Sequence, residues 1–119
     1  GHGVRCVGDP GVVALIRERD VALEVCPTSN VQTGAVRDFW RHPLPNLLAL
    51  DLPVCINTDD PSVSDTTLTD EYWVAMSAMR IRFEQIKETI VTAAEASFQA
   101  AGDRRRMAAW FREQLQMNG

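Results

Sequence analysis

The sequence lacks the features that mark membrane, secreted and nucleic-acid-binding proteins. No stretch approaches the roughly 20 consecutive apolar residues that a membrane-spanning helix needs, and no signal-peptide pattern opens the printed sequence. The net charge of −4 gives no electrostatic reason to expect nucleic acid or an anionic membrane surface as a partner. We therefore expect a cytoplasmic protein without a nucleic-acid or membrane partner.

Cysteine and histidine are scarce, with three cysteines (Cys6, Cys26 and Cys55) and two histidines (His2 and His42). An odd number of widely spaced cysteines is typical of free buried thiols in a reducing compartment, and this spacing excludes a zinc finger. The sequence also contains no glycine-rich phosphate loop, internal repeat or low-complexity tract. Its 119 residues are 45% hydrophobic and 24% charged, which is the balance of one globular domain at most.

Two short apolar runs, residues 21–26 and 53–57, are typical of buried strands. Glu24 interrupts the first run, and a carboxylate there needs a partner or a place near the strand end. Hydrophobic periodicity and capping signals, such as Asp9-Pro10 and the pair Thr67 and Asp70, predict helices. Their expected ranges are about 10–20, 46–50, 68–79, 83–100 and 104–115. Residues 27–30 (PTSN) are expected to form a polar loop.

This order of elements is alternating α/β, in which chemistry is expected at the carboxyl ends of parallel strands. Two strands would leave unpaired sheet edges, and 119 residues are less than half of a barrel of about 250 residues. The chain therefore needs more protein to complete its fold. Its start at Gly1-His2-Gly3, without an initiator methionine, indicates a fragment or a processed or nicked chain.

Residues 57–61 (NTDDP) place two consecutive carboxylates directly after the second strand. Adjacent negative charges repel unless a cation, a proton or hydrogen-bond donors stabilise them. Pro61 lacks a backbone donor and biases Asp60 away from the helical region. Two interpretations stay open at this point. Either an Asp caps a following helix, or the pair forms an active-site edge where one Asp binds a metal and the other binds substrate.

Four segments, in this order, resemble the C-terminal part of the adenosine deaminase family: Gly1-His2-Gly3, residues 23–30 (LEVCPTSN), His42-Pro43 and residues 57–61. The continuation over residues 66–72 (TTLTDEY) is similar to bacterial members in particular. The resemblance implies a zinc-dependent hydrolytic deaminase built on a (β/α)8 barrel. Residues 1–119 would be the C-terminal segment of that single barrel domain, from the end of the sixth strand through the eighth strand and the terminal helices.

The resemblance also implies roles for individual residues. Asp59 matches a zinc ligand, and Asp60 matches the residue that binds N7 of the purine. His2 matches the residue that orients the zinc-bound water and stabilises the hydroxide that attacks C6. Glu24 would hydrogen-bond to His2 and Ser29 to Asp59, which fixes the histidine tautomer and the orientation of the metal ligand. One Zn²⁺ per complete barrel is the implied cofactor, and a purine nucleoside is the implied substrate.

The family pattern further needs a His-x-His pair on the first strand, a histidine ligand on the fifth strand and a nearby glutamate as proton shuttle. None of these is present in the 119 residues. We therefore expect the N-terminal part of the same barrel to be the partner that supplies them, and residues 1–119 alone to be inactive. Three functions stay open: deamination of adenosine or 2′-deoxyadenosine, deamination of another 6-aminopurine such as adenine or an adenosine-like metabolite, and a catalytically silent half-barrel with a structural or interaction role.

Overall fold

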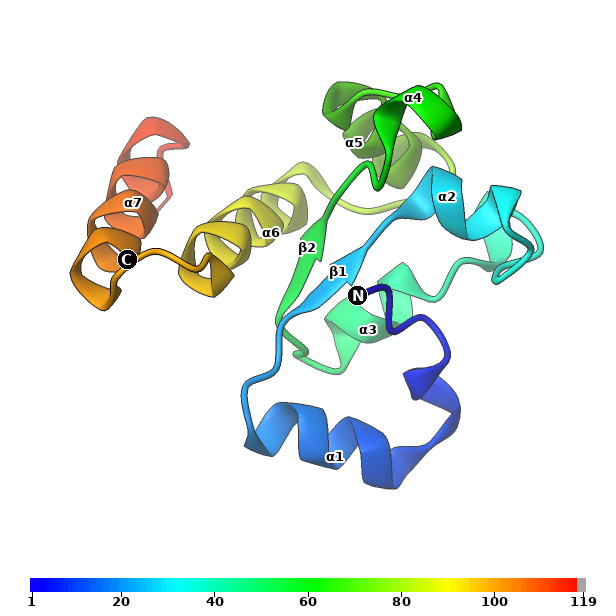
Figure 1. Cartoon of the computed structure of the whole chain (residues 1–119), viewed down its shortest axis with the longest axis horizontal. Coiled ribbons are helices and arrows are strands. Elements are labelled where there is room, and N and C mark those ends of the chain that lie inside the picture. Colours follow the sequence, from blue (N-terminus) through cyan, green and yellow to red (C-terminus); the bar gives the residue numbers. More distant parts are fainter. Residues whose placement is uncertain (118–119) are drawn as a thin grey trace.

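A two-stranded parallel sheet lies at the centre of the chain, whose computed structural model describes residues 1–117 (Figure 1). Strand β1 (Leu23–Val25) pairs with β2 (Val54–Ile56), each somewhat shorter than its sequence pattern predicts. The register sets Leu23 opposite Val54 and Val25 opposite Ile56, so these four buried side chains share one face of the sheet. Glu24 points to the other face and is exposed. This is the arrangement of neighbouring strands in an α/β barrel, with the helices on one face.

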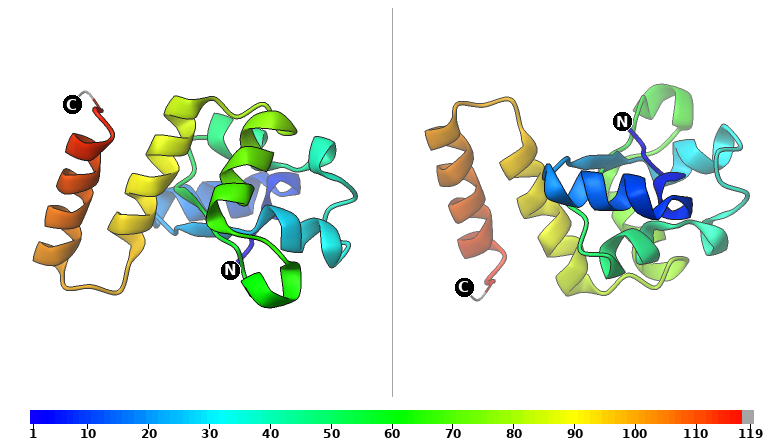
Figure 2. Two further views of the ribbon diagram at one scale, coloured as in Figure 1. Left: turned by 90° about the horizontal axis from the view of Figure 1, so that it is seen from above. Right: turned by 90° about the horizontal axis from the view of Figure 1, so that it is seen from below.

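The helices that the sequence predicts follow one another along the chain in the expected order. Helix α1 (Pro10–Glu18) precedes β1, α3 (Leu44–Ala49) precedes β2, and α6 (Phe83–Ala96) packs against β2. Helix α7 (Ala101–Gln114) contacts α6 and lies on the side of α6 away from the sheet (Figure 2). Predicted helix ends differ by several residues, since α6 ends at Ala96 and α7 already begins at Ala101.

Two predicted helix starts are confirmed by their hydrogen bonds. The side chain of Asp9 accepts from the N–H groups of Gly11 and Val12 and caps α1. Helix α5 (Leu68–Ser77) begins with a capping box, in which the Thr67 side chain accepts from the N–H of Asp70 and the Asp70 side chain accepts from the N–H of Thr67.

Residues 27–30 were expected to be a loop, and that expectation is wrong, because they lie in helix α2 (Pro27–Gln32). The residue before this helix, Cys26, provides no side-chain cap. Instead, the backbone N–H of Thr28 donates to Oε2 of Glu71 at 3.0 Å. Glu71 comes from α5 and is fully buried at 0% exposure. The group that stabilises the start of α2 is therefore distant in sequence, and no local pattern shows it.

Two further short segments complete the fold. Single 3-10 turns are formed by η1 (Cys6–Gly8) and η2 (Phe39–Arg41). After β2, the chain turns through Asp59 into the four-residue helix α4 (Pro61–Ser64). Among the described residues, no helix has both the length and the apolar character needed to cross a membrane.

Candidate active site

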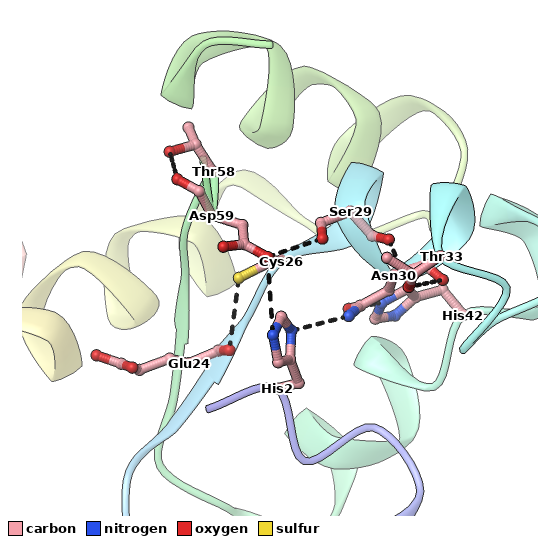
Figure 3. A network of polar contacts seen from close by, with 9 residues as sticks. All are labelled: His2, Glu24, Cys26, Ser29, Asn30, Thr33, His42, Thr58 and Asp59. Atoms are coloured by element: carbon pink, nitrogen blue, oxygen red, sulfur yellow. Dashed lines mark hydrogen bonds and ion pairs between the residues drawn. The ribbon is translucent and has the colours of Figure 1, made fainter. Parts of the chain in front are cut away.

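Three segments of the chain meet at the carboxyl ends of the two strands. The first residues run beside the free edge of β1, where the backbone N–H of His2 donates to the carbonyl oxygen of Glu24 at 2.8 Å. The other two segments are the residues that directly follow β1 and β2. Figure 3 shows His2, Cys26, Ser29 and Asp59 pointing toward one another at this junction. Residues distant in sequence thus converge where an α/β sheet places its chemistry.

Asp59 is held in an unusual conformation at this junction. Its φ is +60°, in the left-handed region that non-glycine residues rarely adopt. Oδ2 of Asp59 accepts a hydrogen bond of 2.8 Å from the Ser29 hydroxyl and lies 3.8 Å from Nε2 of His2. His2 also has a φ of +60°, between two glycines. The side chains of His2 and Asp59 are each 45% exposed, so both reach solvent from strained backbone positions.

Cys26 also belongs to this site, although the sequence pattern predicts only a buried thiol at this position. Its sulfur, an imidazole nitrogen of His2 and a carboxylate oxygen of Asp59 lie within 4.8 Å of one another. Burial, followed by the negative charge of Asp59, raises the pKa of the Cys26 thiol to about 11. Its place in the sequence could have indicated a site residue, because Cys26 directly follows β1 and the Asp pair follows β2 in the same way.

Asp60 lies beside this group and caps a helix. Its Oδ1 accepts hydrogen bonds from the N–H groups of Ser62 at 2.9 Å and Val63 at 3.1 Å, at the start of α4. The capping interpretation of the Asp pair therefore describes Asp60. It does not describe Asp59, whose side chain bonds to Ser29. Because Asp60 is exposed and only Oδ1 is engaged by the cap, its contact with a purine stays a prediction.

Glu24 contacts His2 through its backbone, as described above. Its carboxylate is exposed and forms no hydrogen bond or ion pair with the other residues of the described range 1–117. It lines a hollow of about 260 Å³ together with His2, Thr58 and Asp59. The predicted hydrogen bond between its side chain and His2 stays a prediction.

A larger cavity of about 580 Å³ opens on the other side of His2 and Asp59. Its lining combines the polar side chains of Ser29 and Asn30 with apolar groups that include Val4 and Val12. A cavity of this size with a few convergent polar groups is the usual form of a small-molecule site.

Asn30 and His42 connect His2 to the interior of the protein (Figure 3). The side-chain amide of Asn30 lies 3.1 Å from Nδ1 of His2 through its nitrogen and 3.0 Å from Nε2 of His42 through its oxygen. His42 is 4% exposed, and burial lowers its pKa to about 4. Both residues belong to the segments that resemble the family, but no pattern in the sequence connects them to each other.

The sequence profile of adenosine deaminases matches residues 1–113. The chain belongs to the adenosine deaminase family. An aminodeoxyfutalosine deaminase from Acidothermus cellulolyticus is 53% identical over 74 residues, which are 62% of this chain and 21% of that protein. An adenosine deaminase from Enterococcus faecalis is 39% identical over 98 residues, which are 82% of this chain and 29% of that protein. The chain thus spans less than a third of the length of these family members.

Solved structures confirm the predicted fold, an incomplete α/β barrel. The adenine deaminase from Arthrobacter aurescens superposes with a TM-score of 0.89 at 30% identity, over 97% of this chain and 35% of that one. An amidohydrolase from Burkholderia ambifaria with bound Zn superposes with a TM-score of 0.86 at 19% identity, over 97% of this chain and 32% of that one. At such low identity, the second likeness shows the fold alone.

Proposed function

We propose that residues 1–119 are the C-terminal segment of a single barrel domain that hydrolytically deaminates a 6-aminopurine with the help of one zinc ion. The observation that carries this proposal is the convergence of His2 and Asp59, 3.8 Å apart, at the carboxyl ends of two parallel strands. Membership of the adenosine deaminase family supports it.

The donor set at this junction suits zinc in part. An imidazole and a carboxylate are ligand types that zinc accepts, and a catalytic zinc usually has three protein ligands. We assign Asp59 as the ligand from this chain and the remaining ligands to the N-terminal part of the barrel. Cys26 is a poor ligand as it stands, because its raised pKa keeps it protonated at neutral pH. Bound zinc would activate water for attack at neutral pH.

The chain's own residues have separate roles in this proposal. The hydroxyl of Ser29 holds Asp59 by the 2.8 Å hydrogen bond to Oδ2 and so orients the metal ligand. His2, whose Nε2 lies 3.8 Å from Oδ2 of that carboxylate, orients the attacking water. Asp60 binds the purine at N7 through a proton shared between Oδ2 and N7, while Oδ1 remains engaged at the start of α4. The cavity beside His2 receives the substrate.

Two substrate classes compete within this proposal. Adenosine and 2′-deoxyadenosine are the first candidates, supported by the relative from Enterococcus faecalis. Aminodeoxyfutalosine and adenine are the alternatives, supported by the names of the relative from Acidothermus cellulolyticus and of the structure from Arthrobacter aurescens. All of these compounds share the 6-amino group that the proposed chemistry removes.

The test is ammonia release by the longer protein, purified with its zinc content measured and offered adenosine, 2′-deoxyadenosine, adenine and aminodeoxyfutalosine in turn. We expect one zinc per barrel, turnover of at least one of the four, and no turnover by residues 1–119 alone. The preferred compound identifies the substrate class. A barrel that binds zinc and deaminates none of the four would contradict the proposal and favour a structural or interaction role.

A further inference from the structure

A chain of hydrogen bonds runs from the backbone of α3 to His2, and its direction is fixed at its inner end. The backbone N–H of Leu44 donates to Nδ1 of His42 at 3.0 Å. A backbone N–H can only donate, so Nδ1 of His42 must be the unprotonated, accepting nitrogen. Burial keeps this imidazole neutral at pH 7 because it lowers the pKa to about 4. The single ring proton of His42 is therefore on Nε2.

This proton sets the orientation of the next residue. Nε2 of His42 donates to Oδ1 of Asn30 at 3.0 Å, which leaves the amide nitrogen of Asn30 facing Nδ1 of His2 at 3.1 Å. The Asn30 amide nitrogen can only donate, so Nδ1 of His2 accepts. Asn30 and His42 are 1% and 4% exposed, and hence water cannot readily replace either partner. In the opposite amide orientation, the amide nitrogen of Asn30 and the N–H of His42 would be two donors facing each other, so the His42 contact alone excludes that orientation.

We propose that Asn30 and His42 are positioning residues that keep Nδ1 of His2 unprotonated, so that the ring proton lies on Nε2, the nitrogen that faces Asp59. His2 then presents an N–H donor to the site, so it can hydrogen-bond to an oxygen there and cannot bind a metal ion through Nε2. The effect of this tautomer on turnover rests on the proposed function. The tautomer itself follows from the hydrogen bonds alone.

This assignment differs from the sequence-based expectation, in which the Glu24 carboxylate fixes the tautomer of His2. The contact between these two residues uses the backbone N–H of His2 and the carbonyl oxygen of Glu24, so it places no constraint on the imidazole. Of the two ring nitrogens of His2, Nδ1 has the closer partner, since Asn30 lies at 3.1 Å and Asp59 at 3.8 Å from Nε2.

The tautomer can be read directly from long-range ¹⁵N–¹H NMR spectra of the histidine rings in the longer protein. We expect the Nε2–H pattern for His2, assigned by its loss in a His2→Gln variant. Asn30→Asp replaces the amide donor by an oxygen acceptor at the same position, and it should move the His2 proton to Nδ1. It should also lower kcat by about 10²-fold or more, with KM and zinc content little changed, because a misplaced ring proton removes a positioned donor.

Matched variants separate positioning from general damage to the fold. Thr33→Val removes a hydroxyl at the C-terminal end of α2, which contacts only backbone carbonyl oxygens, of Ser29 at 2.9 Å and of Asn30 at 3.5 Å, and it should leave the His2 pattern unchanged because the Asn30 amide is untouched. His42→Gln keeps a donor near Nε2 and should retain the Nε2–H tautomer, whereas His42→Phe removes it and should give a mixture. This pair tests the proposal even if Asn30→Asp fails to fold.

The outcomes distinguish this proposal from the proposed function. An Nδ1–H pattern for His2 in the wild type, or an unchanged pattern in both folded Asn30→Asp and His42→Phe, would overturn the positioning role. The expected patterns in a protein that deaminates no purine would support the positioning role and contradict the proposed function.

Discussion

The hydroxyl of Ser29 donates a hydrogen bond of 2.8 Å to Oδ2 of Asp59, across 30 positions of sequence. It joins the first turn of α2, after β1, to the turn after β2. Asp59 has a left-handed backbone with a φ of +60°, and such a conformation persists only where surrounding contacts hold it. Ser29 is buried at 6% exposure, so it is a fixed support for a carboxylate that is itself half-exposed.

This hydrogen bond predicts a specific loss in a Ser29→Ala variant of the longer protein. Removing a group that orients a metal ligand typically lowers metal affinity by about 10–100-fold, and we expect zinc affinity to fall by that factor. Competition with a chelator of known affinity measures it. Ser77→Ala is the matched control, because its hydroxyl donates to the Trp73 carbonyl oxygen on α5, away from the site. Equal zinc affinity in wild type and Ser29→Ala would show that Asp59 needs no such support.

The two adjacent aspartates should respond differently to substitution. Asp59→Ala removes the proposed ligand, so zinc and activity should be lost together. Asp60→Asn should retain zinc and the cap of α4, because its side-chain oxygen can still accept from the N–H of Ser62, yet turnover should fall by about 10²-fold or more. Metal analysis and ammonia release on the same preparations measure both effects. Full zinc content in Asp59→Ala would reverse the assignment of the pair.

Comparison with Asp60→Ala separates the cap from the chemistry. This variant should lose turnover like Asp60→Asn, and it should also lose about 1 kcal/mol of stability because the N–H groups at the start of α4 lose their acceptor. If Asp60→Asn turned substrate over at the wild-type rate while Asp60→Ala did not, a neutral side chain that caps α4 and hydrogen-bonds would be sufficient, and proton sharing by the Asp60 carboxyl group would be contradicted.

Local signals in the sequence were sufficient where the stabilising groups are close in sequence. Asp9 and the pair Thr67 and Asp70 cap their own helices, and both predictions are confirmed by hydrogen bonds spanning two or three residues. The parallel order of the two strands likewise followed from their continuous apolar pattern.

Long-range contacts are what the sequence could not show. Helix α2 was missed because its start is stabilised by Glu71, 43 positions away. The link from His42 to His2 was missed because Asn30 connects residues that are 12 and 28 positions from it. Motif resemblance placed His2, Ser29 and Asp59 in one site without explaining which atoms hold them there. That explanation required the relative positions of three separate segments.

Glu71 predicts a stability effect that extends to the site. Its carboxyl group accepts from the N–H of Thr28 at 3.0 Å and from the hydroxyl of Thr66 at 2.8 Å, with no exposure to solvent. Glu71→Ala removes the side-chain acceptor of the Thr28 N–H, leaves the Thr66 hydroxyl only its longer contact of 3.3 Å to the Thr67 carbonyl oxygen and opens a cavity, and we expect a cost of about 3 kcal/mol or more. Urea denaturation of the metal-free longer protein measures this cost.

The conservative and remote variants make the Glu71 prediction specific. Glu71→Gln keeps an acceptor for Thr28, and the Thr66 hydroxyl can rotate to accept, so its cost should be about 1 kcal/mol. Glu113→Ala, on the exposed side of α7, should change stability by no more than about 0.5 kcal/mol. Because α2 carries Ser29, Glu71→Ala should also weaken zinc binding. A large loss of stability with unchanged zinc binding would show that the start of α2 does not affect the position of Ser29.

His42 predicts a pH dependence of stability with a definite sign. Its pKa is lowered from 6.5 to about 4 by burial, so between these values the unfolded chain binds a proton that the folded chain does not. Stability therefore increases with pH over that interval, and the contribution of the neutral imidazole is fully present above pH 6.5. The free energy of unfolding should decrease by about 3 kcal/mol as the pH falls from 6.5 to 4, since one pKa unit corresponds to about 1.36 kcal/mol.

A His42→Gln variant isolates this contribution, because glutamine does not titrate while the other ionisable groups are shared. The free energy of unfolding of both metal-free proteins is measured in urea from pH 7.5 to 4, and the difference between them is plotted against pH. We expect the difference to be constant above pH 6.5. As the pH falls from 6.5 to 4, the wild type should lose about 3 kcal/mol of stability relative to His42→Gln. A difference that stays constant to pH 4 would mean that His42 is protonated as easily in the fold as in the unfolded chain. The direction of the hydrogen bonds from Leu44 to His2 would then lose its fixed starting point.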